Sequence, residues 1–109
     1  MAKKIDGMML KEMFASGAAL LTQNRESVDA LNVFPVPDGD TGTNMTQTIT
    51  SAIKEMNLKR YTSVADVSDA VARGALKGAR GNSGVILSQI LRGFARALAG
   101  HEEIEAPLL

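Results

Sequence analysis

The stretch SVADVSDAVARGALKG, residues 63–78, indicates the fold class most clearly. Ser63 stands where a helix N-cap is expected, and Asp66 follows three residues later in the spacing of a capping box. Apolar side chains then recur at helical spacing, which predicts one buried helix face. That face consists of Val64, Val67, Val71 and Ala75. Ala70, Gly74 and Gly78 lie four residues apart, and this row of small residues predicts the close approach of another backbone.

The sequence before this stretch predicts two more helices and a short helical turn. Residues 6–24 carry Met9, Met13 and Leu20 at helical spacing, with Met8, Leu10, Phe14 and Leu21 beside them. Ser27 is placed to cap a short turn over residues 27–31. A second long helix is expected to begin at residues 41–43 and to fray near Asn57. Its apolar stripe is Met45, Ile49, Ile53 and Met56.

The sequence after residue 78 predicts a turn and then another helix. The turn covers residues 78–82, and the helix runs over residues 83–99 until Gly100 stops it. Residues 102–109 are expected to begin a further helix. No stretch alternates apolar and polar residues far enough to predict a strand. We therefore expect an all-α fold of about four amphipathic helices. The apolar positions of the last long helix are Ile86, Leu87, Ile90, Leu91, Phe94 and Leu98.

The composition narrows the class of protein. The chain has 109 residues, of which 45% are hydrophobic, and its 12 basic and 12 acidic residues cancel. This balance argues against a nucleic-acid binder. The absence of cysteine excludes disulfides and thiolate chemistry. No transmembrane segment or signal peptide is expected, so we predict a cytoplasmic protein.

The first loop of chemical interest is Asn32-Val33-Phe34-Pro35-Val36-Pro37-Asp38-Gly39-Asp40. Its prolines stiffen the backbone, and Asp38 and Asp40 are the hard oxygen ligands that a divalent cation prefers. Asn32 could add a carbonyl oxygen. The next residues open a helix whose free amides attract phosphate. These candidate phosphate-binding residues are Thr41, Gly42, Thr43 and Asn44. The competing interpretation is an ordinary capped turn.

The second such loop is Gly78-Ala79-Arg80-Gly81-Asn82-Ser83-Gly84. Its glycines allow close backbone approach, and a helix follows at once, which makes an anion-binding nest. Arg80 could pair with a phosphate in bidentate fashion. The candidate contacts are Gly81, Asn82, Ser83 and Gly84. The alternative is a glycine-rich turn in which Ser83 is the helix cap and Arg80 is a solvated charge.

Familiar motifs do not explain these loops. An EF-hand starting at Asp38 would need Asp or Asn at its fifth position and Glu at its twelfth, where this chain has Gly42 and Ile49. A Walker P-loop would need Gly-Lys before Ser or Thr, and Asn82 stands before Ser83. A phosphatase of the haloacid dehalogenase type would need a buried strand before its two aspartates, and the proline-rich residues 33–37 do not provide one.

Residues 31–45 and 78–89 together resemble the N-terminal domain of bacterial fatty acid kinase, in the family of the nucleotide-binding subunit of dihydroxyacetone kinase, also called the Dak phosphatase family. The resemblance implies a barrel of about eight amphipathic helices with ATP or ADP at one end. It also implies that Asp38 and Asp40 hold Mg²⁺, with Asn32 where the dihydroxyacetone kinase subunit has a third aspartate. Thr43, Asn44, Ser83 and Gly84 then match phosphate contacts.

The family domain is roughly twice as long as this chain. We therefore expect residues 1–109 to be a partial, truncated nucleotide-binding kinase domain, the first half of the barrel, inactive when isolated. A truncated domain, proteolysis or two copies completing each other would each explain the difference in length. Helices with exposed apolar faces should also self-associate.

The resulting functional hypothesis is the Mg-ATP-binding part of a phosphotransferase that acts on an oxygen acceptor. The resemblance implies that this acceptor is a fatty acid presented by a separate acyl-carrying binding protein. A dihydroxyacetone-like acceptor is the alternative. Asp38, Asp40 and Arg80 are the candidate catalytic residues, and His101 is expected to be a solvated residue rather than a base. The alternatives are an Mg-ADP-binding regulatory or interaction module without catalysis, a fragment without nucleotide affinity, and a phosphatase.

Overall fold

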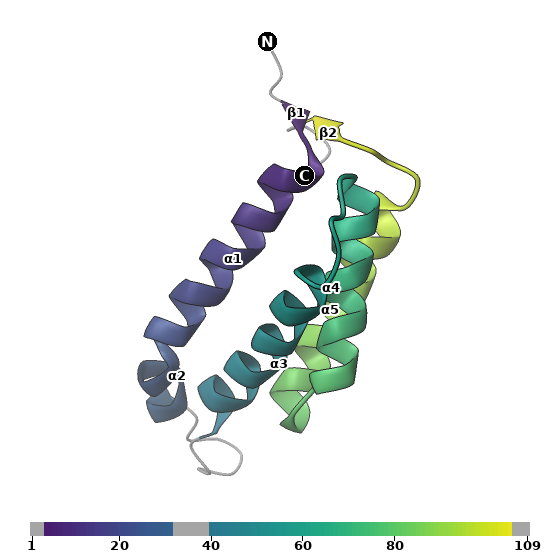
Figure 1. Cartoon of the computed structure of the whole chain (residues 1–109). Coiled ribbons are helices and arrows are strands. Elements are labelled where there is room, and N and C mark those ends of the chain that lie inside the picture. The colour runs from purple at the N-terminus through teal and green to yellow at the C-terminus, as the bar shows by residue number, and fades with distance from the viewer. Residues whose placement is uncertain (1–3, 32–39, 106–109) are drawn as a thin grey trace.

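The computed structural model describes residues 4–31 and 40–105, and it confirms the all-α fold class (Figure 1). Within these residues the chain forms five helices and one two-stranded ribbon. The short turn expected at residues 27–31 is thus a helix in its own right. The elements are β1 (Lys4–Ile5), α1 (Gly7–Gln23), α2 (Arg25–Leu31), α3 (Thr41–Met56), α4 (Val64–Gly78), α5 (Gly81–Leu98) and β2 (Ile104–Glu105).

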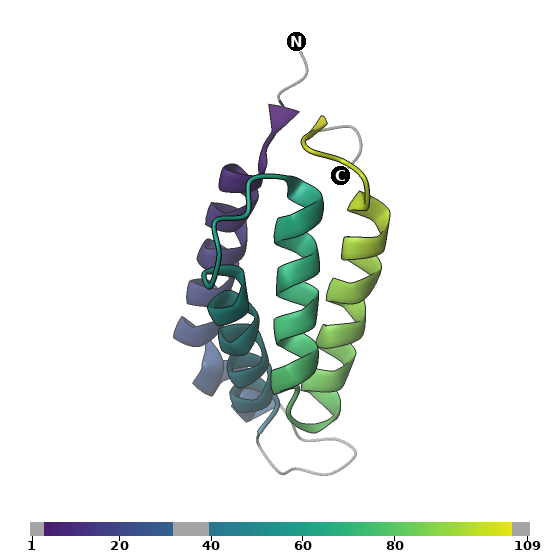
Figure 2. The same cartoon turned by 45° about the vertical axis from the view of Figure 1, so that its right-hand side comes forward.

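Helix α4 lies between α3 and α5, and it runs in the opposite direction to both (Figure 2). Its predicted N-cap is confirmed, because Ser63 accepts a hydrogen bond from the Asp66 amide at 3.1 Å. Its predicted apolar face is also confirmed. Val64, Val67, Val71 and Ala75 are fully buried. Because α4 reverses direction, α3 and α5 both begin at the same end of the molecule.

The small residues of α4 bring α3 close, as their spacing predicts. A Cβ on Gly74 would lie only 2.7 Å from the Ser51 carbonyl oxygen and 2.8 Å from the Ala52 Cα. The Ser51 hydroxyl uses this proximity and donates to the Gly74 carbonyl at 2.8 Å. A Cβ on Gly78 would meet the Ser51 side chain. The α3–α4 contact is therefore a contact between backbones, and it sets the position of both helices.

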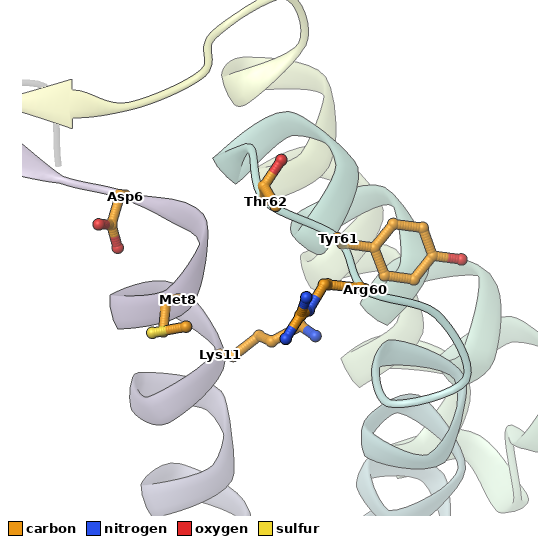
Figure 3. A pocket seen from close by; sticks show the side chains of 6 residues that line it. All are labelled: Asp6, Met8, Lys11, Arg60, Tyr61 and Thr62. Carbon is orange, nitrogen blue, oxygen red and sulfur yellow. The ribbon is translucent and has the colours of Figure 1, made fainter.

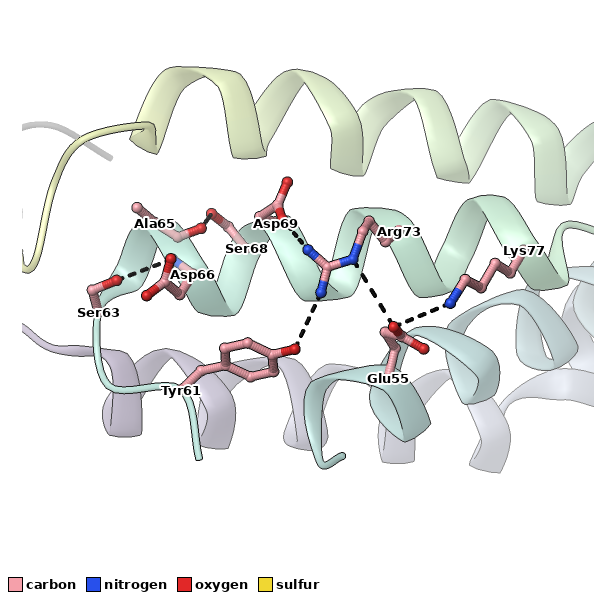
Figure 4. A network of polar contacts seen from close by, with 9 residues as sticks. All are labelled: Glu55, Tyr61, Ser63, Ala65, Asp66, Ser68, Asp69, Arg73 and Lys77. Atoms are coloured by element: carbon pink, nitrogen blue, oxygen red, sulfur yellow. Dashed lines mark hydrogen bonds and ion pairs between the residues drawn. The ribbon is translucent and has the colours of Figure 1, made fainter. Parts of the chain in front are cut away.

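A polar network covers the outer side of this contact (Figure 4). Glu55 of α3 lies 3.2 Å from Lys77 Nζ and 3.9 Å from Arg73 Nε, both on α4. Arg73 also pairs with Asp69 and donates to the Tyr61 hydroxyl at 3.1 Å. Most of these side chains are exposed, so each pair contributes little to stability. Together they cross-link the two helices on the solvent side.

Two expected helix starts are wrong. Helix α2 begins at Arg25, because the Val28 amide already donates to the Asn24 carbonyl, so Ser27 is not its cap. Helix α5 begins at Gly81 rather than residue 83, because the Gly84 amide donates to the Arg80 carbonyl. Ser83 therefore lies in the first turn and is not the N-cap. The stop near Gly100 is confirmed, and that residue has φ of +84°.

The helix expected to begin within residues 102–109 does not form over the described part of that range. Residues 104–105 form β2, which pairs antiparallel with β1, so the expectation of no strand is also wrong. The physical reason is that Ile5 and Ile104 cover the end of the core and are both buried. In addition, the His101 and Glu102 carbonyls accept the first amides of α4, from Ala65 and Val64, at 3.1 and 2.9 Å.

Several apolar side chains remain outside the core. On α1, only Gly7 and Leu10 are buried, and Phe14 reaches Phe94 of α5 with ring centroids 5.7 Å apart. The rest of the predicted α1 stripe is largely exposed, and Ile86 and Ile90 of α5 are also exposed. Among the described residues, no helix is both long and apolar enough to cross a membrane. The exposed α1 side chains are Met8, Met9, Met13 and Leu20.

Candidate functional site

The starts of α3 and α5 lie against each other, and these are the two segments that the sequence singles out. The Ser83 hydroxyl of α5 donates to the Thr41 carbonyl of α3 over 3.4 Å. The Arg80 amide, at the N-cap of α5, donates to the Thr48 hydroxyl of α3 at 3.1 Å. The starts of these two helices are therefore in direct contact in the fold.

Thr48 organises this junction, and the sequence analysis did not identify it. Its side chain is fully buried, and its hydroxyl donates to the Asn44 carbonyl at 2.8 Å while it accepts from the Arg80 amide. One hydroxyl thus joins the first turns of two helices. No local signal marks it, because Arg80 is 32 residues away in the chain.

The glycines at the start of α5 allow this close packing. Gly81 has φ of +64°, a conformation that L side chains rarely adopt, and a Cβ there would also meet the Asn44 side-chain amide. A Cβ on Gly84 would collide with the Thr48 hydroxyl. The prediction that these glycines permit close approach is correct, but the neighbour they accommodate is α3.

Asp29 of α2 holds the start of α3 from another side, and it too was missed. Its Oδ1 accepts from the Thr43 amide at 2.9 Å, and its Oδ2 accepts from the Thr43 hydroxyl at 2.7 Å. Gly42 makes room for α2, since a Cβ there would meet the Arg25 carbonyl oxygen. Thr43 and Gly42 therefore contact α2 within the fold, although both were predicted as phosphate contacts.

The contacts with Thr43 also change the ionisation of Asp29. The hydrogen bond from the Thr43 amide is the largest cause of a lowered pKa for the Asp29 carboxyl, and the bond from the Thr43 hydroxyl is the second. Partial burial acts in the opposite direction, while the Gly42 amide and the positive charge of Arg25 lower this pKa further. Asp29 is therefore a carboxylate at neutral pH, placed beside the positive end of α3.

Asp40 and Arg80 occupy corresponding positions at the two helix starts. Each is the N-cap of its helix, each is exposed, and neither side chain forms a capping hydrogen bond. No ion pair involves either side chain within residues 4–31 and 40–105. Asn82 is exposed beside Arg80. A carboxylate and a guanidinium thus stand at the starts of neighbouring helices.

The amides of the first turn of α5 point out of this end of the helix. Those of Gly81, Asn82 and Ser83 have no intrahelical acceptor because of their position. No acceptor for them is found in the described part of the chain either. Together with the positive end of the helix dipole, they form a surface suited to an anion.

Asp38 and Asn32 lie outside the described residues, so their predicted roles as metal ligands stay predictions. Among the residues that the structure does describe, no three His, Asp or Glu side chains form a metal-binding group. Of the predicted cation ligands, the structure therefore places only Asp40. Its exposed carboxylate, free of capping contacts, fits a role as an oxygen ligand.

A shallow hollow lies at the opposite end of the molecule, between the start of α1 and the connector before α4 (Figure 3). Lys11 lies 5.9 Å from the Tyr61 ring centre and donates to the Lys59 carbonyl at 3.4 Å. Because it lies far from the starts of α3 and α5, this hollow is not part of the candidate site. Its lining residues are Asp6, Met8, Lys11, Arg60, Tyr61 and Thr62.

Comparison with known proteins shows the family of this chain. Residues 35–109 match the family model of the DAK2 domain, which covers most of the chain. The chain therefore belongs to the DAK2 domain family, within the dihydroxyacetone kinase family.

Curated relatives share the sequence over almost the whole chain. The chain is 50% identical to protein YloV of Bacillus subtilis over 104 residues, which are 95% of this chain and 19% of that protein. It is 48% identical to an uncharacterised protein of Staphylococcus epidermidis, over 95% of this chain and 19% of that one. A second uncharacterised protein, from Staphylococcus haemolyticus, is also 48% identical, over 100% of this chain and 20% of that one. The chain thus spans about a fifth of the length of these relatives.

Proposed function

We propose that this chain is the Mg-ATP-binding part of a kinase, with the polyphosphate held where α3 and α5 begin. The observation that carries the proposal is the contact between the starts of α3 and α5, which are tied together through Thr48 and Arg80 and through Ser83 and Thr41. Membership of the DAK2 domain family supports it. The proposal also explains why two glycine-rich helix starts are packed at one end rather than separated.

The residues at this end have complementary roles in the proposal. Asp40 and Asp38 would hold Mg²⁺, whose charge offsets that of the transferring phosphoryl group. The amides at the start of α5 would donate hydrogen bonds to phosphate oxygens, and Arg80 would pair with the phosphoryl group. Asn44 and Ser83 line the junction between the helices. Positioning and charge neutralisation carry most of the catalysis in phosphoryl transfer, and this set of residues would supply both at the phosphate end of the nucleotide.

The phosphate acceptor is the other half of the proposed reaction. We propose an oxygen nucleophile, first a fatty acid presented by an acyl-carrying protein and second a dihydroxyacetone-like compound. His101 does not serve as a base here, because it follows the C-terminal end of α5 while the site lies at its start. A base, where the reaction needs one, must come from the acceptor's carrier or from residues beyond those that the structure describes.

Titration calorimetry of the whole protein with Mg-ADP tests the nucleotide site. Asp40→Asn and Asp38→Asn each remove one negative charge that is meant to face a divalent cation. We expect each to weaken binding by on the order of 2–4 kcal/mol, as for the loss of one partner of a buried charge pair. Asp66→Asn, in the first turn of α4 at the other end, is the matched control and should bind like the wild type. Equal binding by all four proteins would refute the metal-bridged site.

An Mg-ADP-binding regulatory module is the second candidate. It rests on the same contact between the starts of α3 and α5, which could hold a nucleotide without any phosphate acceptor. Both candidates predict the same binding data, so turnover separates them. The kinase proposal predicts that ATP is consumed only when the acceptor and its carrier are present, whereas the regulatory proposal predicts binding without turnover.

A further inference from the structure

We propose that Asp29 caps α3 in place of Asp40 and thereby leaves the Asp40 carboxylate free to take a cation. This inference rests on the proposed function and adds a positioning residue to it. Asp29 belongs to α2 and stands outside both loops that the sequence singles out.

The other helices of the chain show what an N-cap side chain ordinarily does here. Asp6 is the N-cap of α1 and accepts from the amide three residues later, that of Met9, at 2.9 Å. Ser63 does the same at α4 with the amide of Asp66. In α3 the N-cap is Asp40, and the corresponding amide is that of Thr43. An aspartate in this position is a strongly preferred cap, so an Asp40–Thr43 bond is the default expectation.

That bond is absent because Asp29 already occupies the Thr43 amide. One carboxylate oxygen of Asp29 accepts a hydrogen bond from the Thr43 amide, and the other accepts one from the Thr43 hydroxyl. Both donors of Thr43 are therefore already hydrogen-bonded to Asp29. Packing sets this arrangement, since Gly42 allows the α2 backbone to lie directly against the first turn of α3. Because Asp29 accepts the hydrogen bond that an N-cap side chain usually accepts, Asp40 stays exposed and forms no capping bond.

The role of Asp29 matters because a carboxylate that caps a helix is a poorer cation ligand than a carboxylate without a capping bond. An Asp40 engaged with Thr43 would be oriented toward the first turn of α3, and turning it toward a cation would cost the geometry of a charge-assisted hydrogen bond. Asp29 removes that cost by supplying a second, dedicated carboxylate. Removing Asp29 should therefore let Asp40 turn to the Thr43 amide and weaken cation binding indirectly.

A double-mutant cycle measured by Mg-ADP titration of the whole protein tests this. We expect Asp29→Ala to weaken binding about 10- to 100-fold, the range typical for residues that orient metal ligands. Asp29→Ala and Asp40→Asn should not be additive, because the first change already withdraws Asp40. A wild-type affinity for Asp29→Ala, or fully additive losses, would overturn the role of Asp29.

Controls separate this role from a loss of stability. Asp6→Ala removes the same type of cap from α1 at the far end of the molecule, and it should leave the affinity unchanged. If Asp29→Ala does not fold, Asp29→Asn decides, since it keeps one acceptor oxygen for the Thr43 amide. Since Asp40 then stays free, this variant should bind Mg-ADP with close to the wild-type affinity, and Asp40→Asn should still weaken binding in that background. A loss as large as that of Asp40→Asn would show that the charge of Asp29, and not its capping bond, supports the cation, and would overturn the inference. A wild-type protein that does not bind Mg-ADP would instead refute the proposed function itself.

Discussion

Asp29 and Thr48 hold the start of α3 from two sides, each through a partner far away in the chain. Asp29 reaches Thr43 across 14 residues, and Thr48 reaches Arg80 across 32. In both contacts a side chain satisfies a backbone amide near a helix start, where an acceptor within the helix is missing. The geometry of the candidate site therefore depends on polar contacts between helices as well as on the loops.

The Asp29–Thr43 contact predicts a specific dependence of stability on pH. The folded-state pKa of Asp29 is lowered from its ordinary value of 3.8, mainly by the Thr43 amide and then by the Thr43 hydroxyl. Ionised Asp29 therefore stabilises the fold fully above that ordinary value, and its contribution is lost as the pH falls from there through the folded-state pKa.

Asp29→Asn removes this titration. Denaturant midpoints measured from neutral pH down through this window should fall more steeply for the wild type than for the variant. Parallel curves for the two proteins would show that the Thr43 contacts do not favour the ionised form.

For single residues, the sequence predicted the contacts whose two partners lie close together in the chain. The Ser63 cap was predictable because its partner, Asp66, lies three residues away. Asp29 and Thr48 were not predictable, because a carboxylate or hydroxyl on a helix acquires its role only when another helix is placed beside it. For the same reason, the sequence did not show that Asp29 accepts from the Thr43 amide, which an aspartate at the position of Asp40 usually does.

Helices α3 and α4 pack through glycine, and this packing predicts opposite effects for two similar substitutions. Gly74→Ala places a methyl group against the α3 backbone and should destabilise the protein by about 1–3 kcal/mol. Gly93→Ala, in α5, meets nothing within 4 Å and should stabilise it by about 0.5–1 kcal/mol through helix propensity alone.

Urea unfolding of both variants measures the difference. A Gly74→Ala variant as stable as Gly93→Ala would mean that the two backbones do not approach as closely as described.

At the scale of elements, periodicity predicted the long helices well and their ends less well. The buried face of α4 follows directly from its spacing of small and apolar residues. Helix α2 was underestimated because seven residues give little periodicity. The β1–β2 ribbon was missed because each strand has two residues, and its stability comes from Ile5 and Ile104 covering a core end that only the folded chain creates.

At the scale of the whole molecule, α1 and α5 each leave several large apolar side chains exposed among the described residues. Met8, Met13 and Leu20 of α1 are 71%, 48% and 62% exposed, and Ile86 and Ile90 of α5 are 61% and 62% exposed. Apolar surface in such amounts on a chain of this size favours association.

We predict that the 109-residue chain self-associates. Light scattering after size-exclusion chromatography should give a mass above 11.5 kDa that falls when Ile86→Glu and Ile90→Glu are combined. The exposed Gln89→Glu on the same helix is the matched charge control. A monomer at high concentration would contradict this prediction.

The central claim is that the starts of α3 and α5 serve one polyphosphate–magnesium ligand. Backbone amide chemical shifts during an Mg-ADP titration of the whole protein test it most directly. We predict that the amides of residues 41–44 and 80–84 shift together with one dissociation constant, while those of β1 and β2 at the opposite end stay in place. Shifts confined to one of the two helix starts, or to neither, would contradict the account.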